Sequence, residues 1–212
     1  MKIRALLLTL TIVLVCATNV FAQDDKVEIT VDYSFVHFNP QNNNIIGTFN
    51  LNGGGGSIAY YFSKYVGIEG DFQGYGSYTK YIHSTNPTYC PEGCQFTAQG
   101  NLFTYDVGPV FKYRTEHFEP FGEVLFGGAH SNFYGNVYKG CLNSACLAAN
   151  KTPSNNAWDF MIGGGVDIPL TPKITIRPAE FDYLLTRFGN AFTHGNNNQS
   201  NLRYQAGVQF RF

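Results

Sequence analysis

The stretch NLRYQAGVQFRF, Asn201–Phe212, alternates strictly between two kinds of side chain. In an extended strand, successive side chains point to opposite faces. One face would therefore carry the apolar and aromatic residues Leu202, Tyr204, Ala206, Val208, Phe210 and Phe212. The other would carry Arg203, Gln205, Gly207, Gln209 and Arg211. This period of two predicts a β-strand that separates an apolar environment from a polar one.

The same alternation recurs along the chain and predicts an all-β protein. We expect eight strands, at residues 27–38, 49–62, 66–77, 101–114, 120–131, 157–168, 174–185 and 201–212. Long polar connections, including loops at about 78–100, 132–156 and 188–200, alternate with short turns. Long loops at one end and short turns at the other are typical of an eight-stranded antiparallel up-and-down transmembrane β-barrel.

Residues 1–22 have the features of a signal peptide. Lys2 and Arg4 precede the apolar run Ala5–Ala17, which is shorter than the roughly 20 residues of a membrane-spanning helix. Val20 and Ala22 are small residues at the two positions that a signal peptidase reads. We therefore expect an exported protein with a single domain, residues 23–212.

The composition excludes one class of partner and favours the membrane. Without Lys2 and Arg4, 12 basic residues face 15 acidic ones, a net charge of −3, so we expect no binding of nucleic acid. Only 14% of the residues are charged, against about 25% in a typical soluble domain. The alternative is a soluble lipocalin-like barrel around one ligand. In that fold, however, the many aromatic residues would overfill the small core.

The signal peptide, the alternation across residues 27–212 and the terminal YQAGVQFRF together resemble the OmpA-like, or OmpX-type, family of eight-stranded outer-membrane β-barrels. In that family, the barrel-assembly machinery reads a C-terminal Phe with apolar or aromatic residues at every second position upstream. The resemblance implies a monomer in contact with outer-membrane lipid. It implies no cell-wall anchoring, because no peptidoglycan-binding domain follows Phe212. It also implies an assembly signal at Tyr204, Ala206, Val208, Phe210 and Phe212.

Most charged residues fall on the face that would line the lumen of the barrel. They are the acids Glu28, Asp32, Glu69, Asp71, Asp106, Glu123, Asp159, Asp167 and Asp182, and the bases Lys112, Arg114, Arg177, Arg203 and Arg211. Eight strands enclose a space that side chains can just fill, and buried charges need partners. We expect a charge network that plugs the lumen, in which Arg177, Arg203 and Arg211 face carboxylates such as Glu28 or Asp32. A narrow channel, or a barrel that binds a small solute or a lipid, is the alternative.

The segment ITIRPAEFDYLL, Ile174–Leu185, breaks the alternation. If it were regular, Glu180 and Asp182 would face lipid, where a charge costs up to ~2–4 kcal/mol for a basic residue at mid-bilayer and less for an acid near an interface. One extra residue in a strand reverses the faces beyond it. We therefore predict a bulge near Pro178–Ala179–Glu180 that turns both acids into the lumen.

Four cysteines of the exported chain fall in two predicted loops. An oxidising compartment favours disulfides over a zinc site. Pairing within each loop closes a shorter length of chain than pairing between the loops does. We expect bridges outside the strand ladder, at Cys90–Cys94 and Cys141–Cys146.

No catalytic, metal or cofactor site is expected. Some eight-stranded outer-membrane barrels are lipid A deacylases with a His-x-Ser dyad, but His130 and Ser131 are adjacent and would point to opposite faces of a strand. The sequence thus predicts a non-enzymatic barrel that serves envelope integrity or surface interaction through its external loops. It does not identify the partner of those loops.

Overall fold

The computed structural model describes residues 26–39, 48–84, 94–131, 156–188 and 198–212, with the backbone alone at 77–84 and 94–100. No helix in this part of the chain is long and apolar enough to cross a membrane. The eight strands are β1 (Val27–Phe38), β2 (Phe49–Tyr61), β3 (Val66–Ser84), β4 (Cys94–Lys112), β5 (Glu119–Ser131), β6 (Asn156–Pro169), β7 (Ile174–Thr186) and β8 (Gln199–Arg211). The predicted signal peptide lies outside the described residues.

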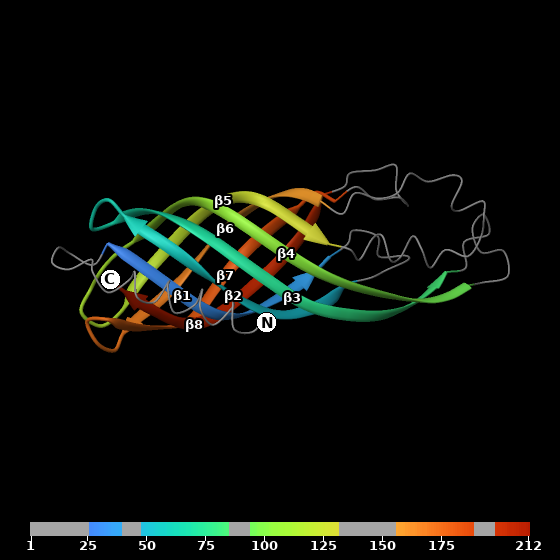
Figure 1. Ribbon diagram of the computed structural model, residues 1–212, viewed down its shortest axis with the longest axis horizontal. Helices are drawn as coiled ribbons and strands as arrows, with labels where there is room; N and C mark the ends of the chain where they lie inside the picture. The colour runs from blue at the N-terminus through green and yellow to red at the C-terminus, as the bar shows by residue number, and fades with distance from the viewer. Residues whose placement is uncertain (1–25, 40–47, 85–93, 132–155, 189–197) are drawn as a thin grey trace, which may run out of the picture.

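The strands form a closed antiparallel barrel in chain order, inclined to its long axis (Figure 1). β1 pairs with β8 from Glu28↔Arg211 to His37↔Leu202. Two backbone hydrogen bonds complete the closure, from the Phe212 N–H to the Val27 carbonyl at 2.9 Å and from the Val27 N–H to the Phe212 carbonyl at 3.2 Å. Because the first and last strands pair, the barrel wall has no open edge. The predicted fold class is confirmed.

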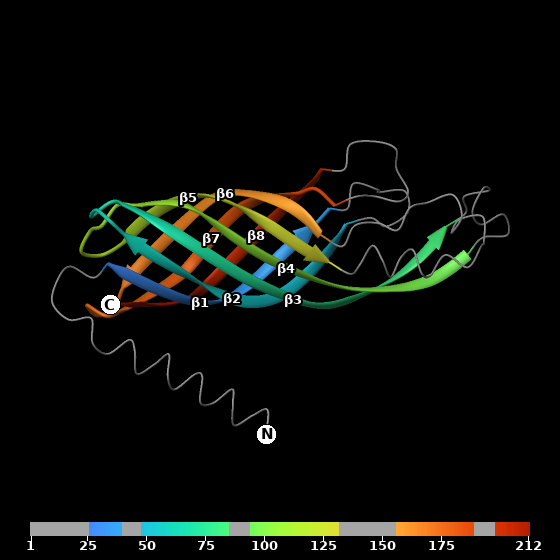
Figure 2. The ribbon, with the colours of Figure 1, turned by 45° about the horizontal axis from the view of Figure 1, so that its top comes forward.

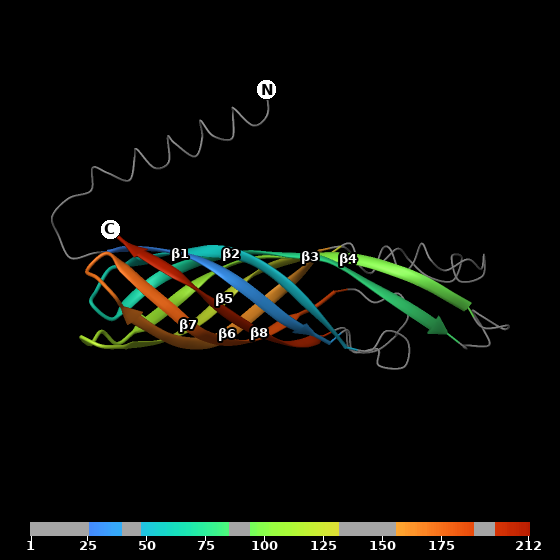
Figure 3. The ribbon, with the colours of Figure 1, turned by 90° about the horizontal axis from the view of Figure 1, so that it is seen from below.

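Each of the three short turns, at 62–65, 113–118 and 170–173, contains a hydroxyl group that accepts backbone hydrogen bonds. Ser63 Oγ accepts from the Val66 N–H at 3.1 Å, and Thr171 Oγ1 accepts from the Ile174 N–H at 3.0 Å. Thr115 Oγ1 accepts from the Phe118 N–H at 3.3 Å. Such local bonds stabilise tight reversals. The C-terminus lies at this same end of the barrel (Figure 3).

β3 and β4 are 19 residues long, against 12–14 for the other strands, and extend as a hairpin beyond the barrel wall (Figure 2). The predicted loop at 78–100 is therefore wrong. The ladder continues from Tyr78↔Gly100 to Ser84↔Cys94 after a register shift that follows Tyr75. Aromatic and β-branched residues favour a strand here despite the polar neighbours.

This longer ladder also affects the cysteines. Cys94 is the first residue of β4 and pairs with Ser84, so its predicted place outside the ladder is wrong. Cys90, Cys141 and Cys146 lie outside the described residues. The local disulfide pairing stays a prediction.

The barrel exterior is apolar. Every charged side chain that the structure describes within a strand lies on the inward face. Large apolar side chains point outward with more than half of their surface exposed, among them Val31 at 59%, Phe72 at 59% and Phe126 at 57%. Near the short turns, Tyr65 and Tyr113 stack on the outer surface with their ring centroids 6.1 Å apart. Apolar residues outside and charged residues inside are the reverse of a water-soluble domain.

β7 contains the irregularity predicted at Pro178–Glu180. Its pairing with β8 shifts register between Arg177 and Glu180. Beyond the shift, Glu180 and Asp182 are each 1% exposed, whereas Phe181 is 57% exposed. The bulge thus keeps both acids inside the barrel, as predicted.

Candidate functional site: the charged lumen

Apolar side chains pack among the charged residues of the lumen, as where Lys112 Nζ lies 5.5 Å from the centroid of the Tyr61 ring. Tyr61, Val110 and Phe121 form a buried cluster with Ala59 toward the short turns. A second buried cluster, toward the long connections, consists of Leu125, Met161 and Leu184. These apolar residues of the lumen were not predicted, although the period of two places them on the same strand face as the charges.

Among the side chains that the structure describes, ten acidic and four basic ones are buried inside the barrel. The acids are Glu28, Glu69, Asp71, Asp106, Glu119, Glu123, Asp159, Asp167, Glu180 and Asp182, and the bases are Lys112, Arg177, Arg203 and Arg211. Asp32 and Arg114 are half-buried. The structure thus brings together all fourteen predicted lumen residues. The two others are Glu180, which the predicted bulge had already turned inward, and Glu119, which was predicted in a turn although it stands four residues before Glu123 on the same strand face.

The part of the network nearer the short turns surrounds Lys112. Its Nζ lies 2.5 Å from Glu28 Oε2 and 2.7 Å from Asp167 Oδ2. Asp167 also binds Arg177, whose Nε lies 2.8 Å from Oδ1. Arg211 Nε lies 3.4 Å from Glu28 Oε1, so one predicted pair is present. Each of these carboxylates is held by at least two cations.

The outer edge of this region is basic. Arg114 Nη1 lies 2.8 Å from Glu28 Oε1, and Arg211 pairs with Glu119. Beside them lies a cavity of about 620 Å³ lined by Lys26, Tyr61, Phe62, Ser63, Lys64, Arg114 and Arg211. The mouth at the short turns is therefore positively charged, whereas the lumen behind it is mainly acidic.

Arg203 is the central cation of the other part of the network, and its side chain is fully buried. Nη1 lies 2.7 Å from Asp71 Oδ1, and Nε lies 2.8 Å from Asp182 Oδ2. Nη2 lies 3.2 Å from Glu180 Oε1 and 3.6 Å from Glu123 Oε1. One guanidinium thus serves four carboxylates that belong to three strands. A planar fork of donors is suited to this arrangement.

Glu180 joins the two parts of the network. Its Oε2 lies 2.7 Å from Arg177 Nη1, while its Oε1 faces Arg203. Ion pairs therefore run without a break from Arg211 to Arg203. Asp32 was expected to face an arginine, and it does not. Instead it accepts hydrogen bonds from the amides of Gln73 at 3.1 Å and Gln205 at 3.4 Å.

Glycine runs on opposite walls of the barrel leave room for these long side chains. Gly53–Gly56 lies on β2 and Gly163–Gly165 on β6, four strands away in the closed order. A Cβ at Gly55 would lie 2.0 Å from the Phe72 carbonyl oxygen, and one at Gly163 would lie 1.9 Å from Asp182 Oδ1. Larger residues would therefore displace the backbone or the carboxylates.

The negative charge of the lumen is only partly compensated. Both carboxylate oxygens of Asp106, Glu123 and Asp159, and Oδ1 of Asp182, accept no hydrogen bond from the residues that the structure describes. Buried polar groups are rarely left in this state. The acidic excess is the main electrostatic property of the site.

His130 and Ser131 do not form a catalytic pair. Ser131 is buried on the lumen side, whereas His130 is on the other face, with its Nδ1 2.7 Å from Asn156 Oδ1. The regular strand separates the two groups, as predicted.

A comparison with protein families identifies the family of this barrel. A family profile described as "Outer membrane protein beta-barrel domain" matches residues 8–212. The chain belongs to this family. The predicted OmpA-like resemblance is thereby confirmed. Membership of this family also implies that the protein is located in the outer membrane.

Solved structures show the same fold for this outer membrane protein. Neisserial surface protein A (NspA) is similar with a TM-score of 0.58 at 12% identity, over 88% of this chain and 97% of that one. OprG from Pseudomonas aeruginosa has a TM-score of 0.52 at 10% identity, over 90% and 98%. Ail, the attachment invasion locus protein of Yersinia pestis, has a TM-score of 0.50 at 14% identity, over 90% and 100%. No curated protein matches the sequence.

Proposed function

We propose that this outer membrane protein is a non-enzymatic barrel with a closed lumen, which holds an external hairpin and long connections for contact with the cell's surroundings. The observation that carries the proposal is the unbroken series of buried ion pairs from Arg211 to Arg203, which packs against two apolar clusters. An eight-stranded barrel leaves little room beyond its own side chains.

Rearranging this network to admit a water path would be costly. Lys112 and Arg203 each bind more than one carboxylate, and neither side chain is exposed. Removing one partner of a buried ion pair typically costs about 3–5 kcal/mol. The closed state is therefore favoured over a narrow channel.

The hairpin formed by β3 and β4 supports a role in surface interaction. Seven residue pairs, from Tyr78↔Gly100 to Ser84↔Cys94, continue the ladder past the barrel wall. At about 3.4 Å per residue, they extend roughly 20 Å. In this proposal, the hairpin contacts an external partner.

The proposed protein is a monomer. The outward side chains of Tyr204, Val208, Phe210 and Phe212 are its signal for insertion into the outer membrane.

Conductance in a planar bilayer tests the closed lumen. The purified protein should give no stable steps in concentrated KCl, under conditions where a porin added as a positive control conducts. Stable steps would contradict the closed lumen and favour the channel. Cation selectivity would then follow from the acidic excess.

A shortened hairpin tests the surface role. A variant with residues 79–99 replaced by a tight turn keeps every pair that β3 and β4 make with β2 and β5. Both chains should restore detergent resistance to cells that lack the protein, whereas only the full-length chain should increase adhesion to cultured cells and to plastic. Equal adhesion by the two chains would contradict the role of the hairpin.

A further inference from the structure

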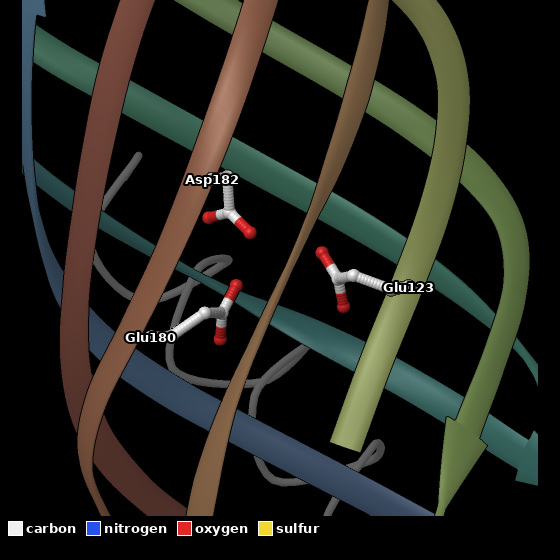
Figure 4. A group of neighbouring side chains, drawn as sticks. All are labelled: Glu123, Glu180 and Asp182. Atoms are coloured by element: carbon white, nitrogen blue, oxygen red, sulfur yellow. The ribbon is translucent and has the colours of Figure 1, made fainter.

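Three carboxylates converge at the centre of the lumen (Figure 4). Glu123 extends from β5, and Glu180 and Asp182 extend from β7. One oxygen of each lies within 4.8 Å of the corresponding oxygens of the other two, and all three side chains are buried.

The strand between them carries no side chain at this level. Gly163 of β6 pairs with Glu123 on one side and with Asp182 on the other. In Figure 4, Glu123 points across β6 toward the two acids of β7. A Cβ at Gly163 would lie 1.9 Å from Asp182 Oδ1. The carboxylates can meet because this position is glycine.

The cluster has a feature that points to a bound ion. Glu123 is 3% exposed, and neither of its carboxylate oxygens accepts a hydrogen bond from the described residues. Asp182 Oδ1 is in the same state. Arg203 is shared among four carboxylates and approaches Glu123 no closer than 3.6 Å. An ionised carboxylate without a close partner is strongly disfavoured in such a place.

We propose that Glu123, Glu180 and Asp182 bind one divalent cation of the hard class, such as Ca²⁺, inside the barrel. Carboxylate oxygens are the preferred ligands of this class. Two oxygens that bind the same Ca²⁺, each at 2.3–2.6 Å, can be at most about 5 Å apart, and the three oxygens of the cluster meet this condition. The ion neutralises the negative charge of the three carboxylates that Arg203 leaves uncompensated.

The competing explanation is protonation, in which the three acids share protons and bind no ion. Both explanations neutralise the cluster, but only the first predicts a fixed stoichiometry that depends on these side chains. The measurement is therefore the content of bound metal. It does not depend on whether the lumen conducts, so the proposed plug and the proposed ion can fail separately.

Glu123→Gln provides the test, because glutamine keeps the shape and removes the charge. Glu119→Gln is the matched control, since Glu119 lies on the same face of β5 and pairs with Arg211. The full-length protein is refolded in zwitterionic detergent with CaCl₂ and separated from free ion, and its calcium is measured by mass spectrometry. A titration after chelation then gives the affinity.

We expect the wild type and Glu119→Gln to retain one more Ca²⁺ per chain than Glu123→Gln, whose affinity should fall at least ten-fold. Equal calcium in all three proteins, or equal loss in both variants, would overturn the proposal. If Glu123→Gln does not refold, the wild type is crystallised with MnCl₂. An anomalous peak among the three carboxylates supports the site, and its absence there overturns the site.

Discussion

Replacing Arg203 with methionine should strongly destabilise the barrel. Methionine fills much of the same volume but leaves Asp71 and Asp182 without the ion pairs that the structure gives them. Glu180 would keep Arg177. Removing one member of a buried pair costs about 3–5 kcal/mol. Because Asp71, Asp182 and the more distant Glu123 all lose their cation at once, we expect the upper part of that range. At 1.4 kcal/mol for each factor of ten, the unfolding equilibrium would shift about a thousand-fold.

Guanidinium-induced unfolding in detergent micelles measures this effect. Trp158, the only tryptophan of the chain, lies on the outer surface and should report the transfer from detergent to water. The control is Arg187→Met, because Arg187 is exposed just past the end of β7. Its unfolding midpoint should match that of the wild type.

A triple variant separates lost ion pairs from altered packing. Combining Arg203→Met with Asp71→Asn and Asp182→Asn removes the stranded charges, so at least half of the lost stability should return. A loss below about 1 kcal/mol in the single variant would refute the reasoning. It would mean that water already solvates these carboxylates.

Three further predictions concern other parts of the chain. Gly163→Ala should cost about 1–3 kcal/mol through overpacking, whereas Gly122→Ala, whose Cβ would have its nearest neighbour at 3.5 Å, should cost little in the same unfolding assay; equal losses would contradict this. Deleting Phe212 should reduce insertion into the outer membrane of cells while leaving the stability of refolded protein nearly unchanged, and normal insertion would count against an assembly signal. Peptide mapping without reductant should find both disulfides within their loops, and serine variants should still form the barrel; a bridge between the loops would show the pairing to be wrong. The bridges in question are Cys90–Cys94 and Cys141–Cys146.

The sequence predicted the barrel because period-two alternation is a local signal. It also predicted the bulge at Pro178–Glu180, since a regular strand would have placed Glu180 and Asp182 in lipid. Both inferences need only the direction of successive side chains. The ends of β3 and β4 were missed because their polar composition, as in the part from Thr79 to Gln99, is typical of a loop. There, aromatic and β-branched residues decided the structure.

The partners inside the lumen could not be predicted in the same way. Which acid an arginine binds depends on the tilt of the strands and on which walls carry glycine. Arg203 was expected to face Glu28 or Asp32 across the β1–β8 seam, yet it reaches Asp71 on β3. Glu119 was missed because it stands at the boundary between a turn and a strand, where sequence patterns are least precise.

The position of Arg203 has a consequence for the order of assembly. β8 supplies Arg203 and Arg211, two of the four cations that are buried among the described residues. Without β8, Asp71, Glu123 and Asp182 would have no cation, and a sheet of β1–β7 would carry an excess of negative charge on its inward face. Partly formed barrels are thereby penalised, and the gain in free energy is concentrated in the closing step. We therefore expect the ion pairs of β8 to make closure of the barrel cooperative.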